Sequence, residues 1–323
     1  MEIHVFLATE AGVYRLEKQG NHLSQTGRYL DDQEITCLAV TGDIILAGTH
    51  NGIYRSEDGA ATWQKLNDSS GDLYLRWIAV HNGGRYTVFA GTEPAAIYVS
   101  NDNGGAWQER PEVARLRDKH GWFLPYSNGA GCVRGFAFHG QRGYAAVEVG
   151  GVLRTDNGGV LWQLAPGSSG NPSMGGVNEP GMIHPDVHSI YTHPYSADLV
   201  CAPTGGGFYL SPDGGQNWKL LYDCYCRAAW WNPENPDHLL LGSADGVERM
   251  GRIEESLDRG RTWNPASEGM QTPWTRHMVE RFVPMKGDLF AVLSNGELWF
   301  SQGNRFVWNE VEVGARVNAA ASA

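Results

Sequence analysis

The feature that most constrains the fold is an eight-residue pattern, Ser-x-Asp-x-Gly-x-x-Trp, that returns along most of the chain. Four copies keep its Ser, Asp and Trp, and they run from Ser56 to Trp63, Ser100 to Trp107, Ser211 to Trp218 and Ser256 to Trp263. Two further copies, Thr155 to Trp162 and Ser301 to Trp308, are imperfect. The six tryptophans are separated by 44, 55, 56, 45 and 45 residues.

A repeat of this length is typical of a unit that cannot bury its own hydrophobic face and has to pack against copies of itself. Upstream of every copy lie two short apolar strands joined by a glycine-containing turn, which suits a four-stranded propeller blade. A seventh unit, Phe6 to Arg15, has the same form without the pattern. We therefore expect an all-β, seven-bladed β-propeller formed as a single domain by residues 1–323.

The first unit begins at its second strand, so blade one lacks an innermost strand at the N-terminus. The C-terminal segment 315–321 has the form of the innermost strands elsewhere. We expect this segment to complete blade one and so protect an exposed sheet edge. A disordered tail is the alternative.

The eight-residue copies resemble the Asp-box (BNR) repeat, and the chain as a whole resembles the bacterial WD40/YVTN/BNR-like family, also labelled sortilin-like or glycosyl-hydrolase BNR. The resemblance implies that each box is the turn between the third and fourth strands of a blade. It implies little about function, because such boxes occur in sialidases, receptor ectodomains and photosystem assembly factors. A sialidase is disfavoured, because the Arg-Ile-Pro motif is missing and seven units are present instead of six.

Composition narrows the classes of partner. The formal net charge of −11 argues against nucleic acid or an anionic membrane. No apolar run reaches the length of a membrane span, and the five cysteines have no disulfide-framework spacing. We expect a cytoplasmic protein without a leader, which separates it from the exported photosystem assembly factors.

The innermost strands line the channel of a propeller, so their polar residues are candidates for a site. Aligning the seven segments places these residues at the second position: Thr36, Arg76, Arg134, His188, Arg227, His277 and Asn318. Arginine and histidine converging on one mouth of the channel would favour a carboxylate or phosphate ligand.

Acidic residues end several of the second strands on the same face, and two interpretations follow. In the first, Arg76, Arg134 and Arg227 pair with Glu93, Glu148 and Asp245 to fill a polar channel. In the second, the basic residues bind an anionic substrate while Glu148 or His188 acts as catalytic acid or base. The long connections 111–132 and 166–188 would then wall the site, and the substrate-binding candidates are Arg76, Arg134, Arg227, His277, Trp122 and Tyr126.

A metal site is a separate hypothesis. His184 and His188 flank Asp186 within five residues, and His50 and His277 could join them across the channel. Such a set suits zinc or another divalent transition metal, which is the candidate cofactor. No HExxH spacing supports it.

The sequence thus favours a small-molecule enzyme, a hydrolase or lyase acting on an anionic or glycoside-like substrate at the channel mouth. The alternative is a non-catalytic scaffold that binds a protein or peptide on its loop-bearing face. An enzyme requires an enclosed pocket, whereas a scaffold requires a broad apolar patch.

Overall fold

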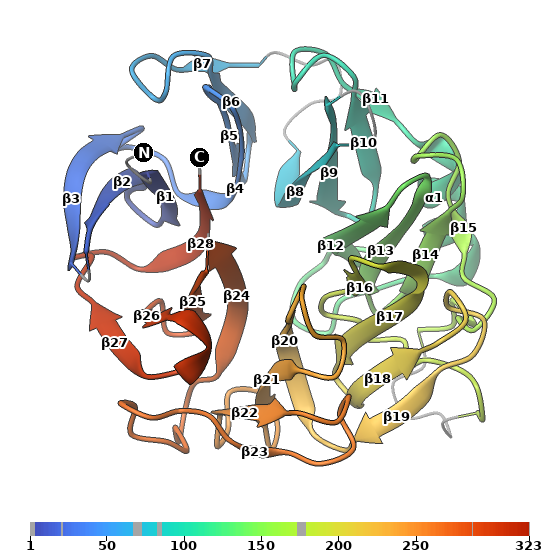
Figure 1. Ribbon diagram of the computed structural model, residues 1–323. Helices are drawn as coiled ribbons and strands as arrows, with labels where there is room; N and C mark the ends of the chain where they lie inside the picture. The colour runs from blue at the N-terminus through green and yellow to red at the C-terminus, as the bar shows by residue number, and fades with distance from the viewer. Residues whose placement is uncertain are drawn as a thin grey trace.

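The computed structural model describes residues 4–20, 22–66, 73–82, 86–172, 179–285 and 287–322. Within these ranges the chain forms seven four-stranded antiparallel sheets arranged in a ring (Figure 1). The all-β, seven-bladed propeller expected from the repeat is confirmed.

Each blade contributes its strands in order from the channel outwards. Blade one contains β28 (Val317–Ser322), β1 (His4–Thr9), β2 (Gly12–Gln19) and β3 (His22–Tyr29). Blade two contains β4 (Ile35–Thr41), β5 (Ile44–Thr49), β6 (Gly52–Ser56) and β7 (Gln64–Lys65). Blade three contains β8 (Tyr74–Asn82), β9 (Tyr86–Glu93), β10 (Ile97–Ser100) and β11 (Gln108–Glu109).

The other four blades follow the same order. Blade four contains β12 (Cys132–His139), β13 (Arg142–Glu148), β14 (Gly151–Thr155) and β15 (Gln163–Leu164). Blade five contains β16 (Tyr191–His193), β17 (Ser196–Thr204), β18 (Gly207–Ser211) and β19 (Lys219–Tyr222). Blade six contains β20 (Tyr225–Trp231), β21 (Leu239–Ala244), β22 (Arg252–Ser256) and β23 (Asn264–Pro265). Blade seven contains β24 (Val279–Met285), β25 (Asp288–Leu293), β26 (Leu298–Gln302) and β27 (Trp308–Val311).

The ring closes through the C-terminal strand. β28 pairs antiparallel with β1, so that Ala319 faces Ala8 and Ala321 faces Phe6. Figure 1 shows the red C-terminal strand beside the blue N-terminal one. The expected closure is confirmed, and the edge of β1 that would otherwise be free is paired.

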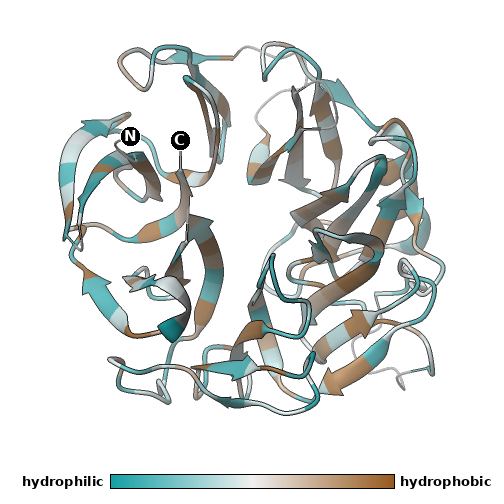
Figure 2. Ribbon diagram, viewed as in Figure 1, coloured by the Kyte–Doolittle hydropathy of each residue, from teal (hydrophilic) through white to brown (hydrophobic). Residues whose placement is uncertain are grey.

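Hydrophobic side chains are concentrated between the blades. Seven clusters of buried residues lie one at each boundary between neighbouring blades. Because each sheet is covered on both faces, the second strands are buried almost continuously, as in β13. Figure 2 shows hydrophobic colour along the strands and hydrophilic colour in many connecting turns.

The turns formed by the eight-residue boxes join the third and fourth strands. In blade three the Ser100 hydroxyl donates to Asp102 Oδ1 at 2.6 Å and accepts the Gly104 N–H at 2.8 Å. Asp102 Oδ1 also accepts the Ala106 N–H at 2.9 Å. The same contacts recur around Asp58, Asp213 and Asp258. Backbone donors of a tight turn are thus satisfied locally, and these carboxylates are structural.

The long connection that enters blade four contains a helix, α1 (Pro111–His120). Proline suits the first turn because its missing N–H needs no partner there, and the helix ends at Gly121 in the left-handed region at φ 65°. The 3₁₀ turn η1 (Gly303–Arg305) lies in the last box. Among the described residues, no helix has the length and apolar character that crossing a bilayer requires.

Candidate functional site

A β-bulge near the start of the inner strand is shared by six blades. The register between inner and second strand shifts by one residue, for example between Leu75 and Trp77 in blade three. The extra residues are Thr36, Arg76, Arg134, Arg227, Glu280 and Asn318. A bulge redirects a side chain, and all six line one cavity at the mouth of the channel.

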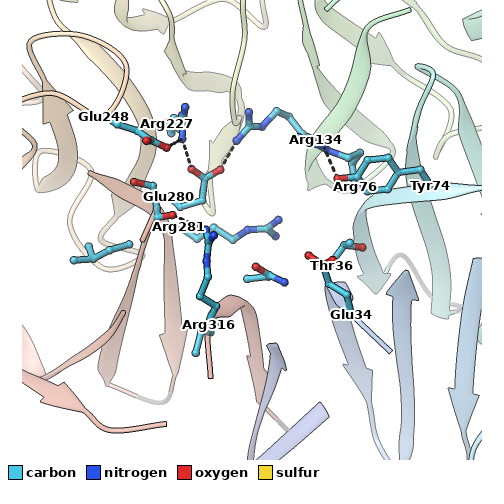
Figure 3. A pocket seen from close by; sticks show the side chains of 14 residues that line it. Glu34, Thr36, Tyr74, Arg76, Arg134, Arg227, Glu248, Glu280, Arg281 and Arg316 are labelled. Carbon is cyan, nitrogen blue, oxygen red and sulfur yellow. Dashed lines mark hydrogen bonds and ion pairs between the residues drawn. The ribbon is translucent and has the colours of Figure 1, made fainter. Parts of the chain in front are cut away.

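This cavity, which we call the channel-mouth pocket, has a volume of about 250 Å³ and is strongly charged (Figure 3). Five arginines and three glutamates line it: Arg76, Arg134, Arg227, Arg281, Arg316, Glu34, Glu248 and Glu280. These residues belong to six blades, one, two, three, four, six and seven, and lie on the strands of these blades or on the loops that connect them. Positive charge therefore exceeds negative charge among the lining residues.

Glu280 bridges two arginines from other blades. Its Oε1 lies 2.5 Å from Arg134 Nη2, and its Oε2 lies 2.8 Å from Arg227 Nη1. Burial opposes ionisation of this carboxyl, but the Arg227 and Arg134 guanidinium groups outweigh burial and hold its pKa well below the usual range. Glu280 thus remains an anion that ties β12, β20 and β24 together.

Two other carboxylates neutralise arginines from behind the pocket. Glu93 Oε2 lies 3.1 Å from Arg76 Nη1, and Glu148 Oε2 lies 2.8 Å from Arg134 Nη1. Burial raises the pKa of Glu148, but Arg134, with smaller contributions from His188 and Tyr126, outweighs burial and lowers that pKa to about 2. Both contacts agree with the channel-filling pairs expected from the sequence.

Arg281 and Arg316 differ from the other arginines of the pocket. Within the part of the chain that the structure describes, neither guanidinium has a carboxylate within 4.0 Å. Arg316 Nη2 donates to the Ser294 carbonyl at 2.8 Å. The Arg281 guanidinium lies 4.1 Å from the centre of the Trp77 ring, and Figure 3 shows Arg281 extending into the cavity. Burial lowers the pKa of Arg281, although arginine stays protonated in proteins.

The expected ring of second-position residues needs a correction in blade seven. Val279 pairs with Leu293 and Glu280 is the bulged residue. The second position of this inner strand is therefore Glu280, and His277 lies three residues before it. His277 instead lies beside Trp274, with ring centroids 5.2 Å apart, and does not line the pocket. Apolar spacing could have found Glu280, because Val279-Glu280-Arg281-Phe282 matches Val133-Arg134-Gly135-Phe136.

The expected pair Arg227–Asp245 also needs a correction. Arg227 Nη1 binds Glu280 at 2.8 Å and lies 3.7 Å from Glu248. Asp245 instead binds Arg252 at 2.9 Å in the same blade. The shared carboxylate of blade seven replaces the one expected from blade six.

The two aromatic candidates lie in different surroundings. Trp122 is buried in the core between blades three and four, where its indole N–H donates to the Gly170 carbonyl at 2.9 Å. Tyr126 has an exposed ring, and its hydroxyl is one of the groups that lower the pKa of Glu148, after Arg134 and His188. Neither residue lines the channel-mouth pocket.

The four histidines considered as metal ligands do not converge. His50 stacks on Tyr74 with ring centroids 4.1 Å apart, and His184 Nδ1 accepts the Asp186 N–H at 3.2 Å. His188 lies instead beside Glu148 and Asp186, and possible ligand atoms of these three side chains are within 4.8 Å of one another. Among the described residues, no other group of three or more such side chains is as close together. Glu148 and His188, the two candidates for acid or base, are both almost fully buried behind the pocket.

Comparison with known proteins supports the fold and does not identify a family. No protein-family model matches the chain, and a search of curated proteins found no match. A solved structure of YCF48 from Cyanidioschyzon merolae has a TM-score of 0.65 at 13% identity, covering 93% of this chain and 91% of that one. A structure described as "YCF48 bound to D1 peptide" has a TM-score of 0.61 at 16% identity, with coverages of 93% and 90%.

An ancestral GH74 enzyme also matches, with a TM-score of 0.63 at 14% identity. The match covers 90% of this chain and only 38% of that enzyme, so this chain corresponds to well under half of its length. At such identities the comparisons show a shared propeller fold, which is found both in an enzyme and in a protein bound to a peptide.

Proposed function

We propose that this chain binds a small anionic molecule, carrying a carboxylate or phosphate, in the channel-mouth pocket. The observation that carries the proposal is Arg281, a partly buried guanidinium that projects into the pocket without a carboxylate partner among the described residues. A buried charge is costly unless it is compensated, and an anionic ligand would supply that compensation.

The surroundings of Arg281 favour a ligand held in a fixed orientation. Trp77 supports one face of the guanidinium, and the Arg134–Glu280–Arg227 bridge forms an adjoining wall. Arginine can bind a carboxylate or phosphate through two parallel N–H groups, which gives directional recognition. The volume of about 250 Å³ suits a ligand at the small end of the range for small-molecule sites.

A thermal-shift screen tests this function. Succinate, glucuronate and phosphate are added separately at constant ionic strength, because a ligand that binds the folded state raises Tm. We expect at least one of them to raise the Tm of the wild type and to lose that effect in Arg281→Met. Arg28→Met is the matched control, because Arg28 also lies over an aromatic ring, Tyr14 at 5.4 Å, and pairs with Asp31 away from the pocket.

Two results would contradict the proposal. In one, none of the three anions stabilises the wild type. In the other, Arg281→Met responds as strongly as Arg28→Met. A scaffold that binds a protein or peptide would give the first result, and the peptide-bound YCF48 structure shows that a propeller of this fold can serve that purpose.

Catalysis is a second candidate, a hydrolase or lyase reaction on the bound anion or glycoside. It is favoured by the contact between His188 Nε2 and Asp186 Oδ2 at 3.1 Å, because an imidazole beside a carboxylate can take up and release a proton. Glu148 is suited to a different role. With a pKa of about 2 it stays ionised at neutral pH and anchors Arg134.

Release of nitrophenol from 4-nitrophenyl glucuronide tests the catalytic candidate. Activity that is lost in His188→Gln and kept in His50→Gln would support it, since His50 is half-exposed and stacks on Tyr74 outside the buried cluster. Absence of release from this and related anionic glycosides would remove the glycoside branch. Binding of the anion in the thermal-shift screen would still stand.

A further inference from the structure

The buried cluster behind Arg134 contains two carboxylates and an imidazole from separate parts of the chain. Glu148 ends β13 in blade four, whereas Asp186 and His188 belong to the connection that enters blade five. Their exposed fractions are 5%, 6% and 1%. Ligand atoms from all three lie within 4.8 Å of one another, which is the spacing expected around one metal ion.

The hydrogen bond of His188 Nδ1 leaves Nε2 as the ring nitrogen with an electron pair that a metal ion could accept. Its Nδ1 lies 2.8 Å from the Cys226 carbonyl, which only accepts, so Nδ1 carries a proton. Its Nε2 then faces Asp186 Oδ2 at 3.1 Å and the Tyr225 hydroxyl at 3.3 Å. A backbone carbonyl that fixes the histidine tautomer in this way is the usual support of a metal-binding imidazole.

Asp186 provides an independent observation. Its Oδ1 is buried and has no hydrogen-bond partner among the described residues, which is rare for a carboxylate oxygen inside a protein. Gly205 makes room for this carboxylate, because a Cβ at that position would lie 2.3 Å from Asp186 Oδ2. The carboxylate is therefore held in the cluster with one oxygen unused.

The charges around the cluster favour a cation. Glu148, Asp186 and Glu280 are three carboxylates, and Arg134 and Arg227 are the two guanidinium groups that contact them in the described chain. With a neutral His188 the group has one negative charge too many for a buried site. A proton on His188 would remove that excess, and so would a metal ion bound by all three side chains.

We infer that Glu148, Asp186 and His188 form a buried site for a divalent transition metal ion, with Arg134 holding Glu148 in place from outside. Carboxylate oxygens with one imidazole suit ions such as Mn²⁺ and Zn²⁺. The metal would fasten the connection entering blade five to blade four, and the His188–Cys226 contact extends this link to blade six. The inference does not depend on the anion proposed for the channel-mouth pocket.

Metal content and thermal stability test the site. The full chain is stripped with a chelator, incubated with Mn²⁺ or Zn²⁺ alone, desalted and measured by elemental mass spectrometry and thermal unfolding. We expect the wild type to bind about one equivalent and to show a higher Tm, because the metal binds the folded state. Asp186→Asn and His188→Gln are expected to lose at least about tenfold in affinity.

His50→Gln is the control, and it is expected to bind metal as the wild type does, since His50 lies outside the cluster. Glu148→Gln provides a third ligand variant in case either of the other two fails to fold. A wild type that binds neither ion stoichiometrically would overturn the inference and leave a protonated His188 as the compensating charge. Retention of wild-type affinity in the folded ligand variants would overturn it as well.

Discussion

The rim and the channel of this propeller both contain polar networks with buried members, but they are built differently. In the eight-residue box of blade three, Ser100 and Asp102 satisfy donors within four residues along the chain. At the channel mouth, Glu280 contacts Arg134, 146 residues away, and Arg227, 53 residues away. The rim network uses local partners, whereas the channel network leaves Arg281 without a carboxylate in the described structure. A network with local partners stabilises a turn. A network across the channel that leaves an arginine charge without a carboxylate offers a binding site for an anion.

The largest effect is expected from Glu280→Gln, which removes the carboxylate shared by Arg134 and Arg227. Breaking a largely buried ion pair leaves uncompensated charge, so the free energy of unfolding should fall by about 3 kcal/mol. Urea denaturation measures the change. Glu248→Gln is the control, because Glu248 is 3.7 Å from the same Arg227 and its side chain is 48% exposed. Equal stability of the two variants would mean that the bridge contributes nothing.

The second prediction concerns pH. The pKa of Glu148 lies at about 2, below the ordinary 4.5, and that of Glu280 is lowered further. The unfolded chain therefore binds more protons below about pH 4.5, and the stability that both carboxylates provide above that pH is lost progressively as the pH falls. Each carboxyl should contribute about 1.4 kcal/mol per pH unit in this window.

Denaturation at pH 7, 5, 4 and 3 checks the pH prediction. Between pH 7 and 5 these carboxyls should not change the free energy of unfolding. Below pH 4.5 the free energy of unfolding of Glu148→Gln should fall less steeply with decreasing pH than that of the wild type, by the contribution of one carboxyl. Identical acid slopes for wild type and Glu148→Gln would show that Glu148 is not held ionised by Arg134.

A smaller effect is expected at the rim. Ser100→Ala removes the acceptor of the buried Gly104 N–H, which should cost about 1 to 2 kcal/mol. Ser100→Thr restores the hydroxyl, and Thr155 fills the equivalent position in blade four. Chemical denaturation compares the two, and a threonine variant no more stable than the alanine variant would argue against the hydrogen bond as the cause.

The smallest effect is expected from Asp245→Asn. Asp245 pairs with Arg252 at the surface, with its side chain 53% exposed, so stability should change by less than about 0.5 kcal/mol. A loss as large as that of Glu280→Gln would instead show that Arg227 uses Asp245 in solution, as the sequence first suggested.

The fold could be predicted because each copy of the repeat independently indicates the same four-stranded unit. The box spacing, the strand pairs and the C-terminal segment each indicate the same ring, and the structure confirms them. The bulged position was also readable in most blades, where Arg76, Arg134 and Arg227 follow an apolar residue. In blade seven the basic residue His277 suggests an inward position three residues before Glu280, whereas the apolar spacing shared with the other blades indicates Glu280.

The partners across the channel could not be predicted in the same way. A repeat indicates which residue of a blade turns inward, but the blades do not all carry the same side chain there, and the contacts of these side chains depend on distances across the ring. Glu280 therefore replaced Asp245 as the partner of Arg227. Likewise, Arg281 lies over Trp77 of blade three, which no spacing along the sequence indicates.

The most direct test of the account is the stability of Arg281→Met, measured by urea denaturation at pH 7 without small carboxylates or phosphate. Methionine retains an apolar contact with Trp77 and removes a partly buried charge that lacks a carboxylate. If the pocket is an unfilled anion site, the variant should be at least as stable as the wild type, by up to about 1 kcal/mol. A loss of about 3 kcal/mol, as expected for Glu280→Gln, would contradict this and make Arg281 part of the structural filling of the channel.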